Sequence, residues 1–180
     1  MNQFSNIDLS ILKRYDKPGP RYTSYPTAPL FRKDFGGAEY EAEILRTNQP
    51  HNNTPLSLYF HIPFCDTLCY FCGCNMLVTL DRAKISEYLG FLKKEIDLVS
   101  ARVNPARKVT QIHWGGGTPT FISHAQMSEL MQHTRDAFSL RNDDRGEYSI
   151  ELDPREADAS TIEPMSRLIA QRVQALLKGE

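Results

Sequence analysis

Outside one short segment, this 180-residue chain has no cysteine, because Cys65, Cys69, Cys72 and Cys74 all fall between residues 65 and 74. It also lacks a charge excess: its net charge is -1, whereas a nucleic-acid partner calls for clustered basic residues. No apolar run reaches the ~18 residues that span a bilayer, and the N-terminus lacks the apolar core of a signal peptide. We therefore expect a cytoplasmic protein with neither membrane nor nucleic-acid partners. In that compartment clustered cysteines bind metal or do redox chemistry more often than they form disulfides.

The first part of the chain, residues 1–54, is predicted to contain an N-terminal helix and a proline-rich arm. Helical spacing marks short helices at residues 1–16 and 39–46. Between them, the segment KPGPRYTSYPTAP carries prolines at a density that blocks helix interiors and sheet ladders, so we expect an extended arm. Its Arg21 and Tyr22 either contact an acidic aromatic ligand or, more simply, pack on their own domain.

Residues 55–180 are predicted to form an α/β core of about three strand–helix units. Strand patterns occur at residues 56–62, 109–114 and 148–152, and helical patterns follow Asp81, begin near Ser123, and run from Ser160 to Leu177. Ser123 and Gln126 form a capping box for the second helix. The apolar face of that helix predicts the core residues Met127, Leu130, Met131, Thr134 and Phe138. Strands that alternate with long helices imply right-handed crossovers and a parallel sheet.

Each predicted strand is followed by an unusual segment. These segments are the cysteine loop, the turn Gly115-Gly116-Gly117-Thr118-Pro119, and the turn Asp153-Pro154-Arg155-Glu156. In parallel sheets, ligands bind beyond the carboxyl ends of the strands. We therefore expect the three segments to meet at one edge of the sheet.

The cysteine spacing favours an iron–sulfur cluster. Thiolates are soft ligands that suit zinc and iron–sulfur clusters, and a four-cysteine zinc site usually pairs two short clips across a longer gap. Here a compact loop, Cys65-x3-Cys69-x2-Cys72, can wrap a cubane and leave one iron open for a substrate or cofactor. Zinc binding and redox thiols remain the alternatives on spacing alone.

The segment HIPF followed by Cys65-x3-Cys69-x2-Cys72 resembles the signature of the radical S-adenosylmethionine (radical SAM) superfamily. Within it, four segments in order resemble the oxygen-independent coproporphyrinogen III oxidases: GPRYTSYPTA, YFHIPFCDTLCYFCGCN, QIHWGGGTPT and SIELDPRE. The resemblance covers residues 10–158. It implies a radical-SAM-type partial (β/α) barrel, truncated here after about three units, with an extended N-terminal arm.

The resemblance also implies an activity and a site. The enzyme would be an oxidoreductase of porphyrin (haem) biosynthesis that converts coproporphyrinogen III to protoporphyrinogen IX by oxidative decarboxylation. A 5′-deoxyadenosyl radical, made from S-adenosylmethionine at a [4Fe-4S] cluster, would start the reaction, with an electron donor and an electron acceptor as further partners. The cluster would be held by Cys65, Cys69 and Cys72 but not by Cys74. The implied S-adenosylmethionine contacts are Tyr59, Phe71, Gly116, Gly117, Thr118 and Glu151. The arm around Arg21 and Tyr22 would cover the substrate site.

Each of these residues also has a simpler interpretation. Tyr59 could be a half-buried strand residue, and the glycines could form a tight turn. Glu151, on an interior strand face, is harder to explain in this way because a buried carboxylate needs a partner. The histidines are expected to make local hydrogen bonds (His61 and His113) or to be solvated (His124 and His133).

The chain departs from the family pattern after residue 158. The family continues into further strands, whereas this tail reads MSRLIAQRVQALLKGE and has no strand pattern. Three strands leave an open sheet edge, so we expect the isolated chain, as the N-terminal part of such an oxidase, to be marginally stable and weakly active or inactive. Two other functions are alternatives to the oxidase: a radical-SAM-like haem chaperone, and a non-catalytic remnant whose loop binds a cluster or zinc. The sequence Cys72-Gly73-Cys74 and the proline-rich arm favour the oxidase over the chaperone.

Overall fold

The computed structural model describes residues 9–16, 27, 30–49, 51–70, 72–141, 145–153, 162, 163 and 165. The chain divides into two compact units, Met1–Tyr40 and Glu41–Glu180. The first contains helix α1 (Leu9–Tyr15) and the start of helix α2 (Gly37–Thr47), so the two predicted short helices are confirmed. The predicted arm around Arg21 and Tyr22 lies outside the described residues, and its role stays a prediction, as does the functional division at residue 54.

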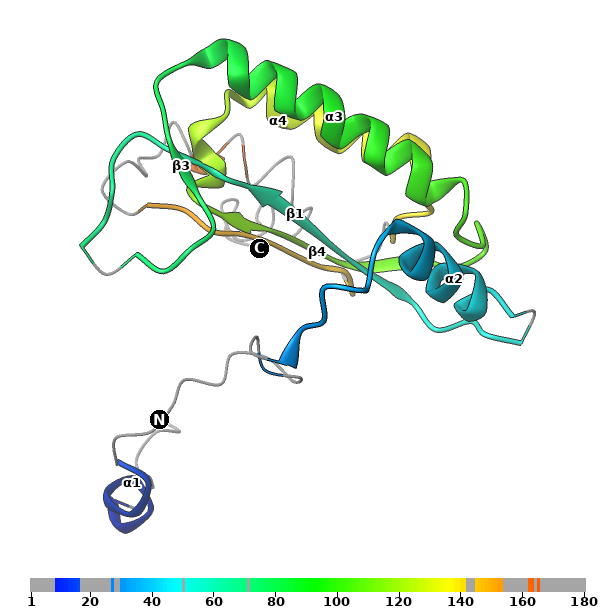
Figure 1. The fold of residues 1–180 in the computed structure, drawn as a ribbon, viewed down its shortest axis with the longest axis horizontal. Helices are drawn as coiled ribbons and strands as arrows, with labels where there is room; N and C mark the ends of the chain where they lie inside the picture. The colour runs from blue at the N-terminus through cyan, green and yellow to red at the C-terminus, as the bar shows by residue number, and fades with distance from the viewer. Residues whose placement is uncertain are drawn as a thin grey trace, which may run out of the picture. The chain divides into compact units, whose positions relative to one another are not determined.

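A three-stranded parallel sheet forms the centre of the second unit (Figure 1). Its order is β1 (Leu56–Ile62), β4 (Val109–Gly116) and β5 (Glu147–Ile150), which confirms the predicted α/β class. Two strand ends differ from the prediction. Strand β4 extends to Gly116, which pairs with Ile62 at the end of β1. Strand β5 stops at Ile150, the partner of Trp114, although the Glu151 amide N–H still donates to the Trp114 carbonyl at 2.9 Å.

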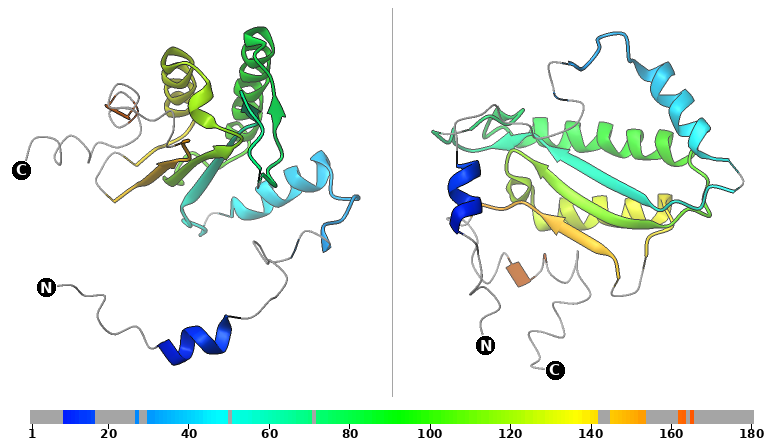
Figure 2. Two further views of the ribbon diagram at one scale, coloured as in Figure 1. Left: turned by 90° about the vertical axis from the view of Figure 1, so that its left-hand side faces the viewer. Right: turned by 90° about the horizontal axis from the view of Figure 1, so that it is seen from below.

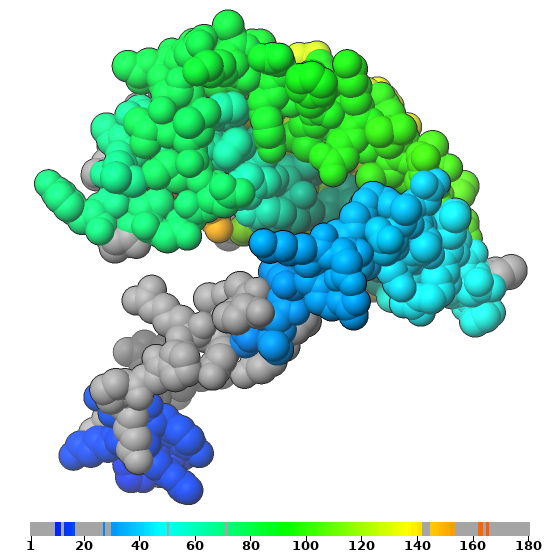
Figure 3. Space-filling model, viewed as in Figure 1, coloured from blue at the N-terminus to red at the C-terminus, as the bar shows by residue number. Residues whose placement is uncertain are grey.

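Two long helices cover the same face of this sheet (Figures 1 and 2). Helix α3 (Arg82–Ser100) begins at the predicted cap Asp81, whose carboxylate accepts the amide N–H of Ala83 at 3.0 Å. Helix α4 (His124–Ala137) begins with the predicted capping box, in which Ser123 and Gln126 satisfy each other's amides. In the space-filling view, the outer side of α3, in green, lies on the surface (Figure 3).

The main core lies between these helices and the sheet. Alternate residues of β1 face the helices, so Phe60 and Ile62 are buried beside Trp114 of β4. The buried residues of α4 are Met127, Leu130, Met131 and Thr134, as predicted. Phe138 differs from the prediction: it is the C-cap of α4 and is only half-buried against the core, because the helix ends one residue before it.

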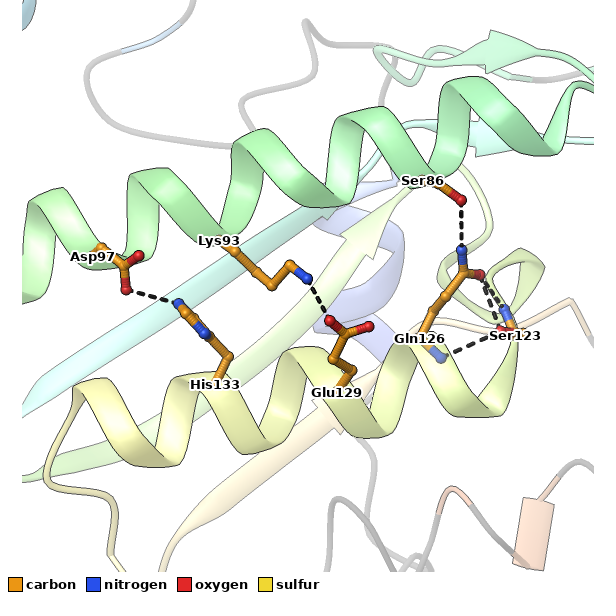
Figure 4. Close-up of polar contacts among 7 residues, drawn as sticks. All are labelled: Ser86, Lys93, Asp97, Ser123, Gln126, Glu129 and His133. Atoms are coloured by element: carbon orange, nitrogen blue, oxygen red, sulfur yellow. Dashed lines mark hydrogen bonds and ion pairs between the residues drawn. The ribbon is translucent and has the colours of Figure 1, made fainter.

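Polar pairs join the two helices along their outer side (Figure 4). Lys93 of α3 pairs with Glu129 of α4, and the Gln126 amide donates to Ser86 Oγ at 3.3 Å. His133, which was predicted to be solvated, is only half-exposed, and its Nε2 lies 2.7 Å from Oδ1 of Asp97.

Two further strands and a short helix, which the sequence patterns did not predict, surround the cysteine segment. Strands β2 (Phe64–Cys65) and β3 (Leu77–Val78) form a parallel pair, and a 3-10 helix, η2, spans Pro119–Phe121. The predicted C-terminal helix falls mostly outside the described residues. Ile162, Glu163 and Met165 are helical, and Met165 belongs to the core cluster. Among the described residues, no helix combines the length and the apolar character that crossing a membrane requires.

Candidate functional site at the carboxyl edge of the sheet

Two of the three unusual segments, the cysteine loop and the glycine turn, lie at one edge of the sheet, as predicted. Strand β1 runs into the cysteine loop, β4 ends in the glycine turn, and β5 is followed by Glu151. All three strands are parallel, so their carboxyl ends lie together. The register places Ile62 beside Gly116 and Trp114 beside Ile150. Part of the third segment, residues 154–156, lies outside the described residues.

The glycine turn is held against the end of β1 and the start of the cysteine loop. The Gly117 amide N–H donates to the Ile62 carbonyl and the Thr118 amide N–H donates to the Phe64 carbonyl, both at 2.8 Å. A Cβ on Gly117 would lie 2.7 Å from the Phe64 carbonyl oxygen and 2.8 Å from Sγ of Cys65. The Thr118 hydroxyl is 3.5 Å from the same thiol. The turn therefore needs glycine because the backbone of the cysteine segment approaches it so closely.

The cysteine loop is closed at its base. The Leu77 amide N–H donates to the Pro63 carbonyl at 2.6 Å, and the Thr79 amide N–H donates to the Cys65 carbonyl at 3.0 Å. Within the loop, the Cys72 amide N–H donates to the Cys69 carbonyl at 3.1 Å.

The four thiols differ in exposure: Cys65 is buried, Cys69 and Cys72 are half-buried, and Cys74 is exposed. Partial desolvation, followed by a hydrogen bond with Cys72, raises the pKa of the exposed Cys74 thiol. Among the described residues, no three His, Cys, Asp or Glu side chains are grouped closely enough to hold a metal ion. A set of three soft thiol donors in one closed loop nevertheless suits an iron–sulfur cluster chemically. Cluster binding by Cys65, Cys69 and Cys72 thus stays a prediction.

Tyr59 lies on the sheet face opposite the helices and is 57% exposed, so it is not the half-buried strand residue that the simpler interpretation describes. Its hydroxyl is 3.0 Å from Nδ1 of His61, whose Nε2 is 2.7 Å from the carbonyl oxygen of Asn75 in the cysteine loop. Partial burial raises the pKa of Tyr59, with smaller contributions from Glu151 and Cys74. These contacts connect the polar face of β1 to the cysteine loop.

Glu151 differs from the expectation of a buried carboxylate. It follows β5 rather than lying within it, and its side chain is 53% exposed. It still has two partners: the Gly116 amide N–H donates to its Oε2 at 3.3 Å, and Nε2 of His113 lies 3.3 Å from its Oε1. A carboxylate this exposed can also accept hydrogen bonds from a ligand hydroxyl or ammonium group.

Gly115, which lies in the predicted glycine turn but is not among the implied S-adenosylmethionine contacts, also belongs to the site. A Cβ on Gly115 would lie 3.0 Å from Cε2 of Tyr59 and 3.2 Å from Cδ of Glu151. The missing side chain therefore leaves the space in which these two side chains meet. The signal in the sequence that could have identified Gly115 is the run of three glycines. In the structure each of these glycines lies close to different neighbours. Phe71, the remaining predicted contact, lies outside the described residues.

Relatives of known identity match the chain closely. It is 46% identical over 166 residues to the oxygen-independent coproporphyrinogen III oxidase of Pseudomonas aeruginosa, a match that covers 92% of this chain and 36% of that protein. A protein of the same description from Mannheimia haemolytica is 46% identical over 147 residues, which are 82% of this chain and 96% of the relative. The chain belongs to the family of oxygen-independent coproporphyrinogen III oxidases.

A solved structure shares the fold of this family member. The coproporphyrinogen III oxidase HemN from Escherichia coli, described as a radical SAM enzyme, superposes with a TM-score of 0.71 at 41% identity, covering 91% of this chain and 34% of HemN. The predicted partial radical-SAM-type barrel is thereby confirmed. The chain spans about a third of the length of HemN and of the Pseudomonas relative. No protein-family model matches the chain.

Proposed function

We propose that this chain carries the cofactor-binding part of an oxygen-independent coproporphyrinogen III oxidase. In this proposal the [4Fe-4S] cluster is held by Cys65, Cys69 and Cys72. S-adenosylmethionine is bound by Tyr59, Phe71, Gly116, Gly117, Thr118 and Glu151. The substrate is coproporphyrinogen III, whose propionate side chains are decarboxylated oxidatively, and the location is the cytoplasm.

One observation carries the proposal: the cysteine loop, the glycine turn and Glu151 meet at the carboxyl edge of a parallel sheet. Such edges are where α/β folds bind ligands. The thiols of the loop supply soft ligands for iron, and the Thr118 hydroxyl lies beside the Cys65 thiol. The glycine turn exposes backbone to a ligand without obstruction by side chains. A cluster that binds three of the four thiols would supply the electron that cleaves S-adenosylmethionine.

The residues on the open face of the sheet have separate tasks in this proposal. The exposed ring of Tyr59 offers a flat apolar surface, and its hydroxyl is already engaged with His61. Glu151 contributes negative charge and acceptor oxygens, which suit a ligand that carries hydroxyl groups and positive charge. Together these residues would orient S-adenosylmethionine beside the cysteine loop.

Anaerobic reconstitution with iron and sulfide tests the proposal. We expect the purified chain to take up both elements in the ratio of a [4Fe-4S] cluster, and the EPR signal of the reduced cluster to change when S-adenosylmethionine is added. Zinc in place of iron would refute the cluster. A cluster whose EPR signal does not change when S-adenosylmethionine is added would identify a non-catalytic remnant.

Two cysteine variants provide a matched comparison within the same loop. Cys69→Ser removes a proposed ligand, so reconstituted iron should fall to a small fraction of the wild-type content. Cys74→Ser removes the exposed thiol that is not a proposed ligand, so iron content should be unchanged. Equal iron loss in both variants would contradict the proposed division of the four thiols.

A further inference from the structure

His113 lies at the centre of the polar face of the sheet. The register aligns it with Tyr59 on one neighbouring strand and with Ser149 on the other. The rings of Tyr59 and His113 stack, with centroids 5.8 Å apart and planes inclined by 15°. Nδ1 of His113 is 2.8 Å from Oγ of Ser149, and Nε2 is 3.3 Å from Oε1 of Glu151. The His113 imidazole therefore contacts Tyr59 of β1 on one side, and Ser149 of β5 and the following Glu151 on the other.

The hydrogen-bonding groups determine how this ring is oriented. A carboxylate only accepts hydrogen bonds, so Nε2 of His113 carries the hydrogen that points to Glu151. In the neutral ring Nδ1 is then an acceptor, and it accepts from the hydroxyl of Ser149. The chain of donors therefore runs from Ser149 through His113 to Glu151. A ring held at both nitrogens cannot rotate without losing a bond.

Glu151 would be poorly fixed without this ring. Its side chain is half-exposed and lies beyond the end of β5, and its other partner, the Gly116 amide, is 3.3 Å away. Gly115 offers no side chain for it to pack against. His113 therefore restricts both Glu151 and Tyr59, whose ring it supports.

We propose that His113 is a positioning residue for S-adenosylmethionine binding: it orients Glu151 through Nε2 and supports Tyr59 by stacking. This inference rests on the proposed function, because it assigns a role within the same site. His113 would act through Glu151 and would not itself be a catalytic residue.

The test measures S-adenosylmethionine binding by anaerobic equilibrium dialysis with the cluster-loaded chain. The variant His113→Phe keeps an aromatic ring beside Tyr59 but loses both polar contacts. We expect its Kd to rise about 10-fold, as for loss of a hydrogen bond to a charged group, with unchanged iron content and urea midpoint. His113→Gln, whose amide can reach the position of Nε2, should recover part of this loss.

A double variant separates positioning from a general structural effect. If His113 acts through Glu151, then His113→Phe should change Kd less than about 2-fold in the Glu151→Gln background. The matched control is His133→Phe, which breaks a second histidine–carboxylate contact, the one between His133 of α4 and Asp97 of α3 on the helix layer (Figure 4). We expect this control to leave Kd unchanged.

The outcomes distinguish the two proposals. If Glu151→Gln weakens binding but His113→Phe does not, or if their effects simply add, the positioning role is wrong and the proposed function stands. If the wild-type chain binds no S-adenosylmethionine, both proposals fail. A second measurement needs no cofactor. The 15N NMR spectrum of the imidazole should show a hydrogen on Nε2 of His113. A neutral ring protonated only at Nδ1 would overturn the inference.

Discussion

Replacing Gly116 by alanine tests whether the glycine turn is a structural requirement of the sheet edge. Gly116 is the only described residue with a positive φ, at 122°, a conformation that residues with a Cβ rarely adopt. A Cβ there would lie 2.8 Å from the carbonyl oxygen of Ile62. That carbonyl accepts the Gly117 amide N–H, so it cannot move away without weakening a bond that holds the turn.

The expected cost combines two contributions. A residue forced into a sparsely populated backbone conformation costs about 1–3 kcal/mol. Weakening the bond between Gly117 and Ile62 adds about 0.5–1.5 kcal/mol. We therefore expect Gly116→Ala to lower the free energy of unfolding by about 1.5–4.5 kcal/mol.

Urea unfolding of the cluster-free chain, followed by circular dichroism, provides the assay, and two other glycines provide the comparison. Gly90 lies inside α3 with nothing within 4 Å of an added Cβ, so Gly90→Ala should stabilise by about 0.5–1 kcal/mol. At Gly115 the nearest contact, at 3.0 Å, is with the exposed side chain of Tyr59. The Tyr59 side chain can move to a less favourable rotamer, so Gly115→Ala should cost about 0.5–1.5 kcal/mol. If Gly116→Ala unfolded at the same urea concentration as Gly90→Ala, the argument for a required glycine would be refuted.

Three further predictions concern the helix layer. Ser123→Ala removes the cap of α4 and should lower the free energy of unfolding by about 1 kcal/mol; no change in the urea midpoint would contradict this. Met131→Ala, at a position that is 0% exposed, should cost about 2–5 kcal/mol by leaving a cavity, whereas Leu98→Ala, at 59% exposure, should change stability by less than about 0.5 kcal/mol. Similar losses in both would argue against the packed core. Finally, a hydrogen bond from the Lys93 ammonium, followed by its charge, holds the pKa of Glu129 below its ordinary value. The stabilisation from this pair is therefore present above the ordinary carboxyl pKa and is lost as pH falls through the folded pKa. Lys93→Met should raise the pKa of Glu129 in an NMR titration, and an unchanged pKa would rule out the pairing.

The fold was predictable where local signals were strong. The alternation over residues 56–62 and the caps at Asp81 and Ser123 each express a local preference that the tertiary structure keeps. The convergence of the cysteine loop and the glycine turn at one edge followed from the topology of parallel strands. Strand ends were less predictable because they depend on partners. Strand β5 stops two residues before its predicted end, even though the Glu151 amide N–H still donates to the Trp114 carbonyl of β4.

The details of the site depend on strand register, which the sequence does not reveal. The register between β1 and β4 shifts between Leu56 and Ser57, and after this shift Tyr59 lies beside His113. A register displaced by one residue would point His113 toward the helices. The sequence could therefore place His113 near a strand end and predict local hydrogen bonds for it, but could not identify Tyr59, Ser149 and Glu151 as its neighbours.

The two faces of the sheet have separate physical roles. On the helix face, Phe60, Ile62 and Trp114 are buried and contribute about 1.5–3 kcal/mol each through apolar burial. On the opposite face, Tyr59 and Glu151 are largely exposed and gain little from packing. Their positions rest on hydrogen bonds and on one stacked ring. Substitutions on this face should therefore alter ligand binding more than folding, and Gly116 is the exception because its backbone also holds the two strands together.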